Sequence, residues 1–234
     1  LFRGIVMNGG SGHSIRYNEI YNMQNSTSHS SGIYLNVGST SFTNVVGNKI
    51  HSLVPGLAFL QVNGIQVQTG SVNIVNNMIR LGLYADGTSI EASGAIAGIY
   101  LVSTTTEANI YFNSIYIGGS VTGTTATNSY GARIENSVKN IRNNIFYNAR
   151  SNVTTGGKHY ALSLSNFTGL VEDNNIYHVT GTNGFLASIV SVDKTTIDGI
   201  RTSTFQDVQS QAVDPKFINP TGNATLFDLH IDAT

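Results

Sequence analysis

The sequence predicts an all-β protein wound into a parallel solenoid, and three observations lead to this fold class. An asparagine recurs about every thirty residues, two places before an isoleucine. A short apolar strand pattern that begins at glycine or alanine recurs with the same period. Asn, Ser, Thr, Gly and β-branched residues, which disfavour helices, are abundant throughout. A fixed period of this length indicates stacked repeats, each forming one coil.

The asparagine repeat predicts two columns of stacked side chains. Its units are Asn18-Glu-Ile20, Asn48-Lys-Ile50, Asn77-Met-Ile79, Asn113-Ser-Ile115, Asn143-Asn-Ile145 and Asn174-Asn-Ile176. Equivalent residues of neighbouring coils lie above one another at about 4.8 Å. We therefore expect the isoleucines to form an interior column. The asparagines should form a ladder at a turn, where this residue tolerates a left-handed backbone and stacked amides can bond.

Two further apolar series complete the coil. The strand pattern reads Gly4-Ile-Val-Met7, Gly32-Ile-Tyr-Leu35, Gly64-Ile-Gln-Val67, Gly98-Ile-Tyr-Leu101, Gly131-Ala-Arg-Ile134 and Ala161-Leu-Ser-Leu164. A third apolar residue precedes most asparagines, at Ile15, Val45, Ile74, Ile110, Ile141 and Val171. Three short strands in each unit predict a solenoid of about six coils over residues 1–178. The period then fails, and residues 179–234 are expected to form a C-terminal cap of the same domain.

These repeats resemble those of the right-handed parallel β-helix, or pectate-lyase-like, superfamily, over residues 1 to about 180. The tail, Asp214-Pro-Lys-Phe217 followed by Phe227-Asp-Leu-His-Ile231, resembles the closing segment of secreted bacterial surface β-helix proteins. The resemblance implies right-handed coils. It does not imply one activity, because lyases, hydrolases, tailspikes and adhesins share this fold.

Composition narrows the classes of partner. Only 11% of the 234 residues are charged, and the scattered basic residues provide no cluster for phosphate contacts, so we do not expect nucleic-acid binding. Without cysteine there is no thiolate metal site, and we expect neither a metal nor a cofactor. No apolar run is long enough to span a membrane. The many Asn, Ser, Thr and Gly residues favour a protein outside the cell or at a bacterial cell surface.

The first residues already follow the strand pattern, with Gly4-Ile5 inside a predicted strand. An uncovered solenoid end leaves unpaired backbone groups, which proteins normally cover. We therefore expect either continuation in a longer polypeptide or end-to-end self-association with another copy.

Strand register predicts a flat outer surface. Side chains alternate along a strand, so the residue after each isoleucine of the strand pattern should point outward. This column reads Val6, Tyr34, Gln66, Tyr100, Arg133 and Ser163, and the next reads Asn8, Asn36, Gln68, Val102, Glu135 and Ser165. Aromatic rings can stack on sugars, and planar polar groups can bracket hydroxyls. We predict a glycan-binding face that comprises Tyr34, Gln66, Tyr100, Arg133 and Glu135. The alternative is an ordinary solvent-exposed sheet face.

Loop length varies on one side of the coil only. The longest loops, residues 81–97, 118–130 and 149–160, all follow the asparagine unit and precede the next glycine strand. Loops that project from rigid scaffolds often carry function. Drift in loop length without selection would produce the same pattern.

No catalytic motif is evident. Glycoside hydrolases need two carboxylates together, but the only adjacent acids are Glu172-Asp173. Lyases of this superfamily need acids that hold calcium and a basic residue, and acids are sparse in the first five coils. A grouping of Arg133, Glu135, Lys158 and His159 across coils is the remaining candidate. His51 is expected to pack or face solvent.

We favour a non-catalytic segment of a secreted or cell-surface protein, acting as a rigid stalk or adhesin that binds a glycan. Two alternatives stay open at this point. A polysaccharide lyase or glycoside hydrolase would bring three or more acids together on one outer patch. A self-assembling fibre would stack through complementary coil ends.

Overall fold

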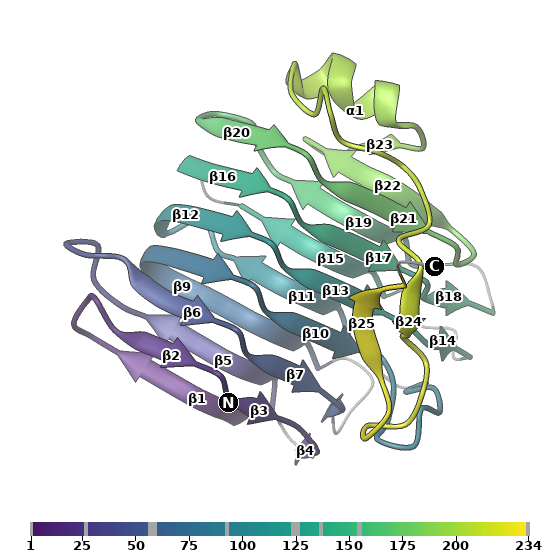
Figure 1. Ribbon diagram of the computed structural model, residues 1–234, viewed down its shortest axis with the longest axis horizontal. Coiled ribbons are helices and arrows are strands. Elements are labelled where there is room, and N and C mark those ends of the chain that lie inside the picture. Colours follow the sequence, from purple (N-terminus) through teal and green to yellow (C-terminus); the bar gives the residue numbers. More distant parts are fainter. Residues whose placement is uncertain are drawn as a thin grey trace.

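The chain forms a β-solenoid of about five turns, with 55% of its residues in strands and 4% in helix. The computed structural model describes residues 2–25, 28–55, 60–91, 94–122, 127–135, 138–153 and 156–232. Figure 1 shows the coils stacked from the N-terminal to the C-terminal end. The prediction of an all-β fold with parallel coils is confirmed, with about five turns in place of about six.

Each coil contributes strands to three parallel sheets. Sheet A contains β1 (Phe2–Asn8), β5 (Ser30–Asn36), the first part of β9 (Val62–Val75), β11 (Ile96–Leu101), β15 (Ser129–Ile134), β19 (His159–Leu164) and β22 (Gly184–Ile189). Sheet B contains β2 (Ser14–Arg16), β6 (Thr43–Val46), the rest of β9, β12 (Thr105–Tyr111), β16 (Val138–Arg142) and β20 (Leu170–Asp173). Sheet C contains β3 (Glu19–Ile20), β7 (Lys49–His51), β10 (Met78–Leu81), β13 (Ser114–Ile117), β17 (Ile145–Asn148) and β21 (Ile176–Val179).

The loops between sheet C and sheet A carry short strands of their own. Here β4 (Met23–Asn25) pairs with β8 (Leu53–Pro55), and β14 (Ser120–Val121) pairs with β18 (Ser151–Asn152). The long predicted loops at residues 118–130 and 149–160 are therefore neighbours, joined by β14 and β18.

The asparagine ladder exists, but its last two members lie one residue later than predicted. Asn18, Asn48, Asn77, Asn113, Asn144 and Asn175 form it, and each of the first five donates to the carboxamide oxygen of the next at 2.9–3.1 Å. The left-handed residue is the one before each ladder asparagine, so Asn143 and Asn174 (φ 58° each) occupy that position. The expectation of a left-handed ladder asparagine is therefore wrong.

The same shift changes the interior column of sheet C. Ile20, Ile50, Ile79 and Ile115 stack in register as predicted, followed by Phe146 and Tyr177 rather than Ile145 and Ile176. In sheet B, Glu172 pairs with Ile141 and is buried, whereas Val171 is half-buried. Glu172 rather than Val171 therefore takes the position of Ile141 in this coil, because the last coil is shifted by one residue.

Glycine at the start of the strand pattern is required by close packing. A Cβ atom on Gly64 would lie 2.5 Å from the carbonyl oxygen of Gly98 and 2.7 Å from Cγ2 of Ile79. Both distances are too short for a real contact. The interior isoleucine column and the glycine column therefore depend on each other.

The C-terminal segment covers the last coil and then returns along the outside. After β22, β23 (Val192–Lys194) pairs antiparallel, and helix α1 (Ile197–Thr204) places Ile200 in the core cluster. The hairpin of β24 (Phe217–Asn219) and β25 (Asp228–Ile231) packs against Leu83, Tyr116 and Ile145. Figure 1 shows this yellow hairpin crossing in front of sheet C.

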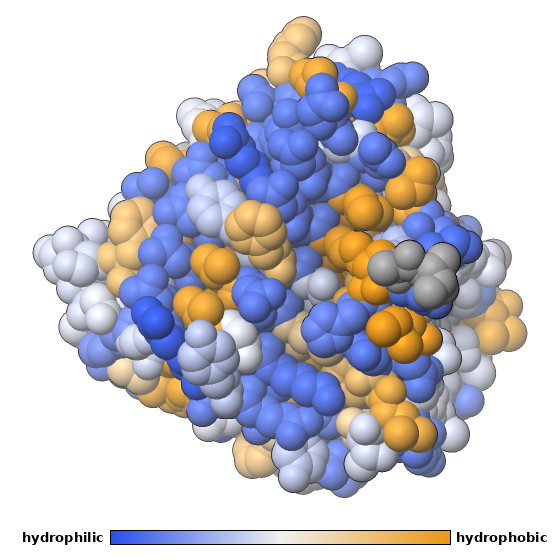
Figure 2. Space-filling model, in the orientation of Figure 1, coloured by the Kyte–Doolittle hydropathy of each residue, from blue (hydrophilic) through white to orange (hydrophobic). Residues whose placement is uncertain are grey.

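The face formed by sheets B and C is uneven in polarity. Figure 2 shows hydrophobic residues gathered beside the hairpin, whereas hydrophilic residues predominate over sheet B. Within the described part of the chain, no helix is long and apolar enough to cross a membrane.

Candidate functional site

The predicted outward column of sheet A has the expected register. Val6, Tyr34, Gln66, Tyr100, Arg133 and Ser163 are paired successively from β1 to β19. The next column is interrupted, because a register shift in β9 pairs Asn36 with Thr69 rather than with Gln68. Glu135 follows the end of β15 and remains beside Arg133.

The N-terminal half of the predicted face is closed by its own side chains. Tyr34 is only 8% exposed, and the Arg3 guanidinium carbon lies 3.1 Å from the centre of its ring. The carboxamide oxygen of Gln66 accepts from Ser31 Oγ at 2.9 Å and from Asn63 Nδ2 at 3.1 Å. Tyr34 and Gln66 therefore offer little free surface, which register alone could not reveal.

The C-terminal half brings Tyr100, Arg133 and Glu135 together. Arg133 forms an ion pair with Glu135 at 2.6 Å, and its guanidinium carbon lies 4.9 Å from the Tyr100 ring centre. The Tyr100 hydroxyl donates to Glu135 Oε2 at 3.3 Å. Burial raises the pKa of Tyr100, so this hydroxyl stays protonated at neutral pH. These three residues hold one another in place.

An aromatic ladder next to this group was missed by the sequence analysis. The rings of Tyr130 and Tyr160 are stacked with their centres 5.6 Å apart, and the centres of Tyr160 and Phe185 are 5.7 Å apart. These residues are in register on β15, β19 and β22. The signal was present, because Tyr130 and Tyr160 each directly precede the repeat Gly or Ala. We call Tyr100, Tyr130, Arg133, Tyr160 and Phe185 the aromatic patch.

Polar groups border the aromatic patch on its far side. Lys158 Nζ forms an ion pair with Asp193 Oδ2 at 2.5 Å, and the Tyr160 hydroxyl donates to Asp193 Oδ1 at 2.9 Å. Glu135 borders the opposite side. The patch is therefore an array of rings between two sets of hydrogen-bonding groups.

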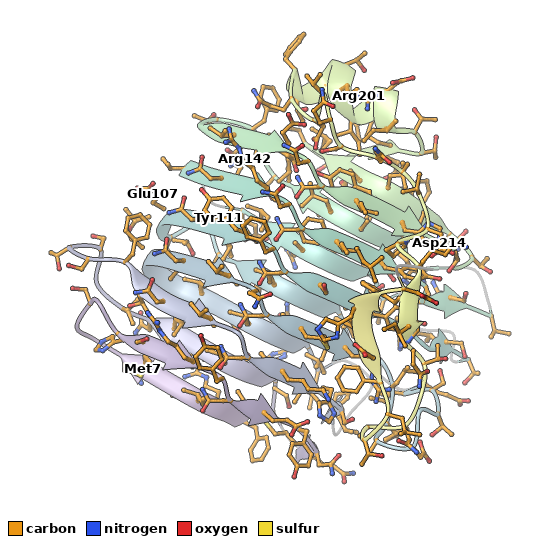
Figure 3. The ribbon with its side chains drawn as sticks, viewed as in Figure 1. Met7, Glu107, Tyr111, Arg142, Arg201 and Asp214 are labelled. Carbon is orange, nitrogen blue, oxygen red and sulfur yellow. The ribbon has the colours of Figure 1, made fainter. Side chains whose placement is uncertain are left out.

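Sheet B offers a different kind of surface. Asn44, Asn73, Asn109 and Asn140 form an outer ladder with amide-to-oxygen distances of 2.7–2.9 Å. The Tyr111 hydroxyl donates to Asn109, and Figure 3 shows Tyr111 and Arg142 on this face. These amides therefore bond mainly to one another.

The catalytic grouping considered above is not assembled. His159 lies inside the solenoid with no exposed surface, and its Nδ1 is 2.8 Å from Ser129 Oγ. Arg133 and Lys158 are each paired with a carboxylate. Among the described residues, no group of three or more His, Asp and Glu side chains is placed to hold a metal ion.

The long loops are fixed to the solenoid by a buried arginine. Arg150 donates to the carbonyl oxygens of Gly118 at 2.9 Å and Ile90 at 2.8 Å. Burial lowers the pKa of Arg150 to about 10, so it remains charged at neutral pH. This role was not predicted, because the two partners lie 32 and 60 residues away in sequence.

Comparisons with known proteins do not assign the chain to a family. No family model, curated protein sequence or solved structure matches it. The functional conclusion therefore depends on the geometry of the surfaces described above.

Proposed function

We propose that this chain is a rigid, non-catalytic segment of a secreted or cell-surface protein that binds a polysaccharide through the aromatic patch of sheet A. The observation that carries the proposal is the set of partly exposed rings of Tyr100, Tyr130 and Phe185 on one outer face, with the buried ring of Tyr160 packed between the last two. Such rings can stack on sugar faces, and Glu135 and Lys158 border them.

Rigidity is the second part of the proposal. The buried asparagine ladder joins each coil to the next through side-chain hydrogen bonds, in addition to the backbone pairing of three sheets. Each buried amide that lost its partner would cost about 1–3 kcal/mol. A stack joined in this way suits a stalk that must keep a binding face flat.

We also propose, from its repeats, that the chain belongs to the pectate-lyase-like superfamily.

The carboxylates of the patch favour binding over catalysis. Glu135 is paired with Arg133, and Asp193 accepts from both Lys158 and Tyr160. Glycoside hydrolysis needs one carboxyl group that gives a proton and a second that acts as base or nucleophile. Two carboxylates held in ion pairs are poorly suited to those roles.

A polysaccharide screen tests this function. The purified chain would be applied to a glycan array and to insoluble polysaccharides, and product release would be followed on every ligand that binds. We expect retention on at least one polysaccharide without new reducing ends or unsaturated sugars. Release of such products would show that the chain is an enzyme, and the absence of any binding would leave only the structural role.

A further inference from the structure

A groove lies between the first two coils of sheet C and the returning C-terminal segment, away from the aromatic patch. Its volume is about 610 Å³, and its lining includes Glu19, Tyr21, Lys49, His51, Asn223 and Thr225. The first four residues come from neighbouring coils, and the last two from the tip of the C-terminal hairpin. The groove is therefore complete only when that hairpin is in place.

His51 forms the fixed base of the groove. It is buried, with its Nε2 3.2 Å from Glu19 Oε1 and its Nδ1 3.0 Å from Ser52 Oγ. Burial lowers the pKa of His51, so the ring is neutral at pH 7. Because the Glu19 carboxylate can only accept, Nε2 carries the proton and Nδ1 accepts from Ser52. One tautomer and one ring orientation are thereby selected.

Tyr21 lies on this fixed ring as an exposed platform. Its ring is nearly parallel to that of His51, with an interplanar angle of 8° and a centre-to-centre distance of 5.2 Å. Phe227 meets His51 edge-on at 4.8 Å. Tyr21 nevertheless remains 51% exposed. An aromatic ring that is supported by a locked neighbour, and still exposed, is preorganised for stacking.

The charges around the groove balance. Lys49 Nζ lies 3.6 Å from Glu19 Oε1 and 4.3 Å from the Phe227 ring centre. Arg80 is buried, with its guanidinium carbon 4.5 Å from the same ring, and it donates to the carbonyl oxygens of Gly222 and Tyr84. Among the residues that line the groove, the Glu19 carboxylate offsets the charge of Lys49. The groove therefore does not favour an anion, but it offers both donors and acceptors.

We propose that this groove is a second ligand site that takes a neutral sugar residue, stacked on Tyr21 and hydrogen-bonded by Glu19, Lys49 and Asn223. A sugar ring presents an apolar face and a rim of hydroxyls, which is the complement of an exposed ring between polar groups. The site does not depend on ligand binding by the aromatic patch, since the two share no residue.

The absence of tryptophan from this chain provides a specific probe. Tyr21→Trp places a single indole on the platform, and Phe167→Trp places one on an exposed turn of a distant coil as the control. Glucose, galactose, mannose, N-acetylglucosamine and, as a charged comparison, glucuronate would be titrated into each variant. Saturation-transfer NMR on the unmodified chain would report binding independently of the substitution.

We expect a neutral sugar to give saturation transfer and a saturable change in Tyr21→Trp emission, with no change in Phe167→Trp. Glu19→Gln should weaken binding about tenfold, because a hydrogen bond to a charged group is lost. Glu107→Gln, on the outer face of sheet B, should not weaken it. Circular dichroism would confirm that each variant is folded. If Tyr21→Trp does not fold, saturation-transfer NMR of Glu19→Gln and of the unmodified chain tests the groove without it.

Four results would overturn the proposal. These are binding of glucuronate alone, no binding of any neutral sugar, a Glu19→Gln variant that binds normally, and loss of sugar binding in a Tyr100→Ala, Tyr130→Ala variant. The last result would place the sugar on the aromatic patch and leave the groove empty. Binding that survives in that variant supports the groove even if the aromatic patch binds no polysaccharide.

Discussion

At the scale of single residues, the buried His159 gives the clearest prediction. Burial, and to a smaller extent Arg150, lower the pKa of His159 from 6.5 to about 4. The pKa of this histidine is lower in the folded state than in the unfolded chain, so the unfolded chain binds a proton more tightly. The free energy of unfolding therefore decreases as pH falls from the unfolded-state pKa towards the folded-state pKa. We expect this residue alone to remove about 2 kcal/mol between pH 7 and pH 5.

The measurement is urea unfolding of the unmodified chain and of His159→Gln at both pH values. Glu172 and Asp207 have the opposite effect on stability. Burial raises their pKa values, so a fall in pH stabilises the folded state relative to the unfolded chain at these two residues. The comparison between the two chains removes that common contribution. An equal loss of stability in both chains would contradict the prediction, and His230→Gln, at an exposed site, is the matched control.

Residue-level prediction from the sequence succeeded where the repeat was unambiguous and failed at asparagine doublets. Asn18, Asn48, Asn77 and Asn113 are in the ladder as predicted. In the last two coils either asparagine of the doublet fits the spacing, and both accept a left-handed backbone. Only the inward packing of Phe146 and Tyr177 decides between them, and that depends on tertiary contacts.

At the scale of elements, the C-terminal hairpin should be a separable unit. Phe217, Phe227 and Leu229 are the buried apolar side chains that hold it to sheet C, and Phe227 also contacts His51, Arg80 and Lys49. Loss of a buried phenylalanine side chain costs about 3–5 kcal/mol. We expect Phe227→Ala to increase amide exchange throughout β24 and β25 while the exchange of β11 and β15 stays unchanged.

Hydrogen exchange followed by mass spectrometry measures this directly. Leu226→Ala removes an exposed neighbouring side chain and should leave the exchange of β24 and β25 as it is in the unmodified chain. Faster exchange across all three sheets in Phe227→Ala would show that the hairpin is part of one cooperative unit.

The elements of the coils were predictable, whereas those after residue 190 were not. Period-two alternation and the recurring glycine and asparagine positions predicted three strands in each coil. Helix α1 is short, and the position of the hairpin over the first coils depends on contacts such as that of Arg80 with Gly222. Such contacts join residues that are far apart in sequence and leave no periodic signal.

At the scale of the whole molecule, the solenoid converts a sequence repeat into a flat surface. Residues at the same position of successive repeats become neighbours about 4.8 Å apart. This is how Tyr130, Tyr160 and Phe185, each separated by a full coil in sequence, form one aromatic array. The sequence predicted the outward column of sheet A, but not that the Arg3 guanidinium covers the ring of Tyr34 in that column.

The most direct test of this account is a binding isotherm on the polysaccharide that retains the chain. The unmodified chain would be compared with the Tyr100→Ala, Tyr130→Ala double variant and with Tyr111→Ala on sheet B as the control. Because each stacked ring contributes about 0.5–1.5 kcal/mol beyond its buried area, we predict at least a tenfold loss of affinity in the double variant and none in the control. Equal affinity of all three chains would contradict the assignment of the aromatic patch as the ligand face.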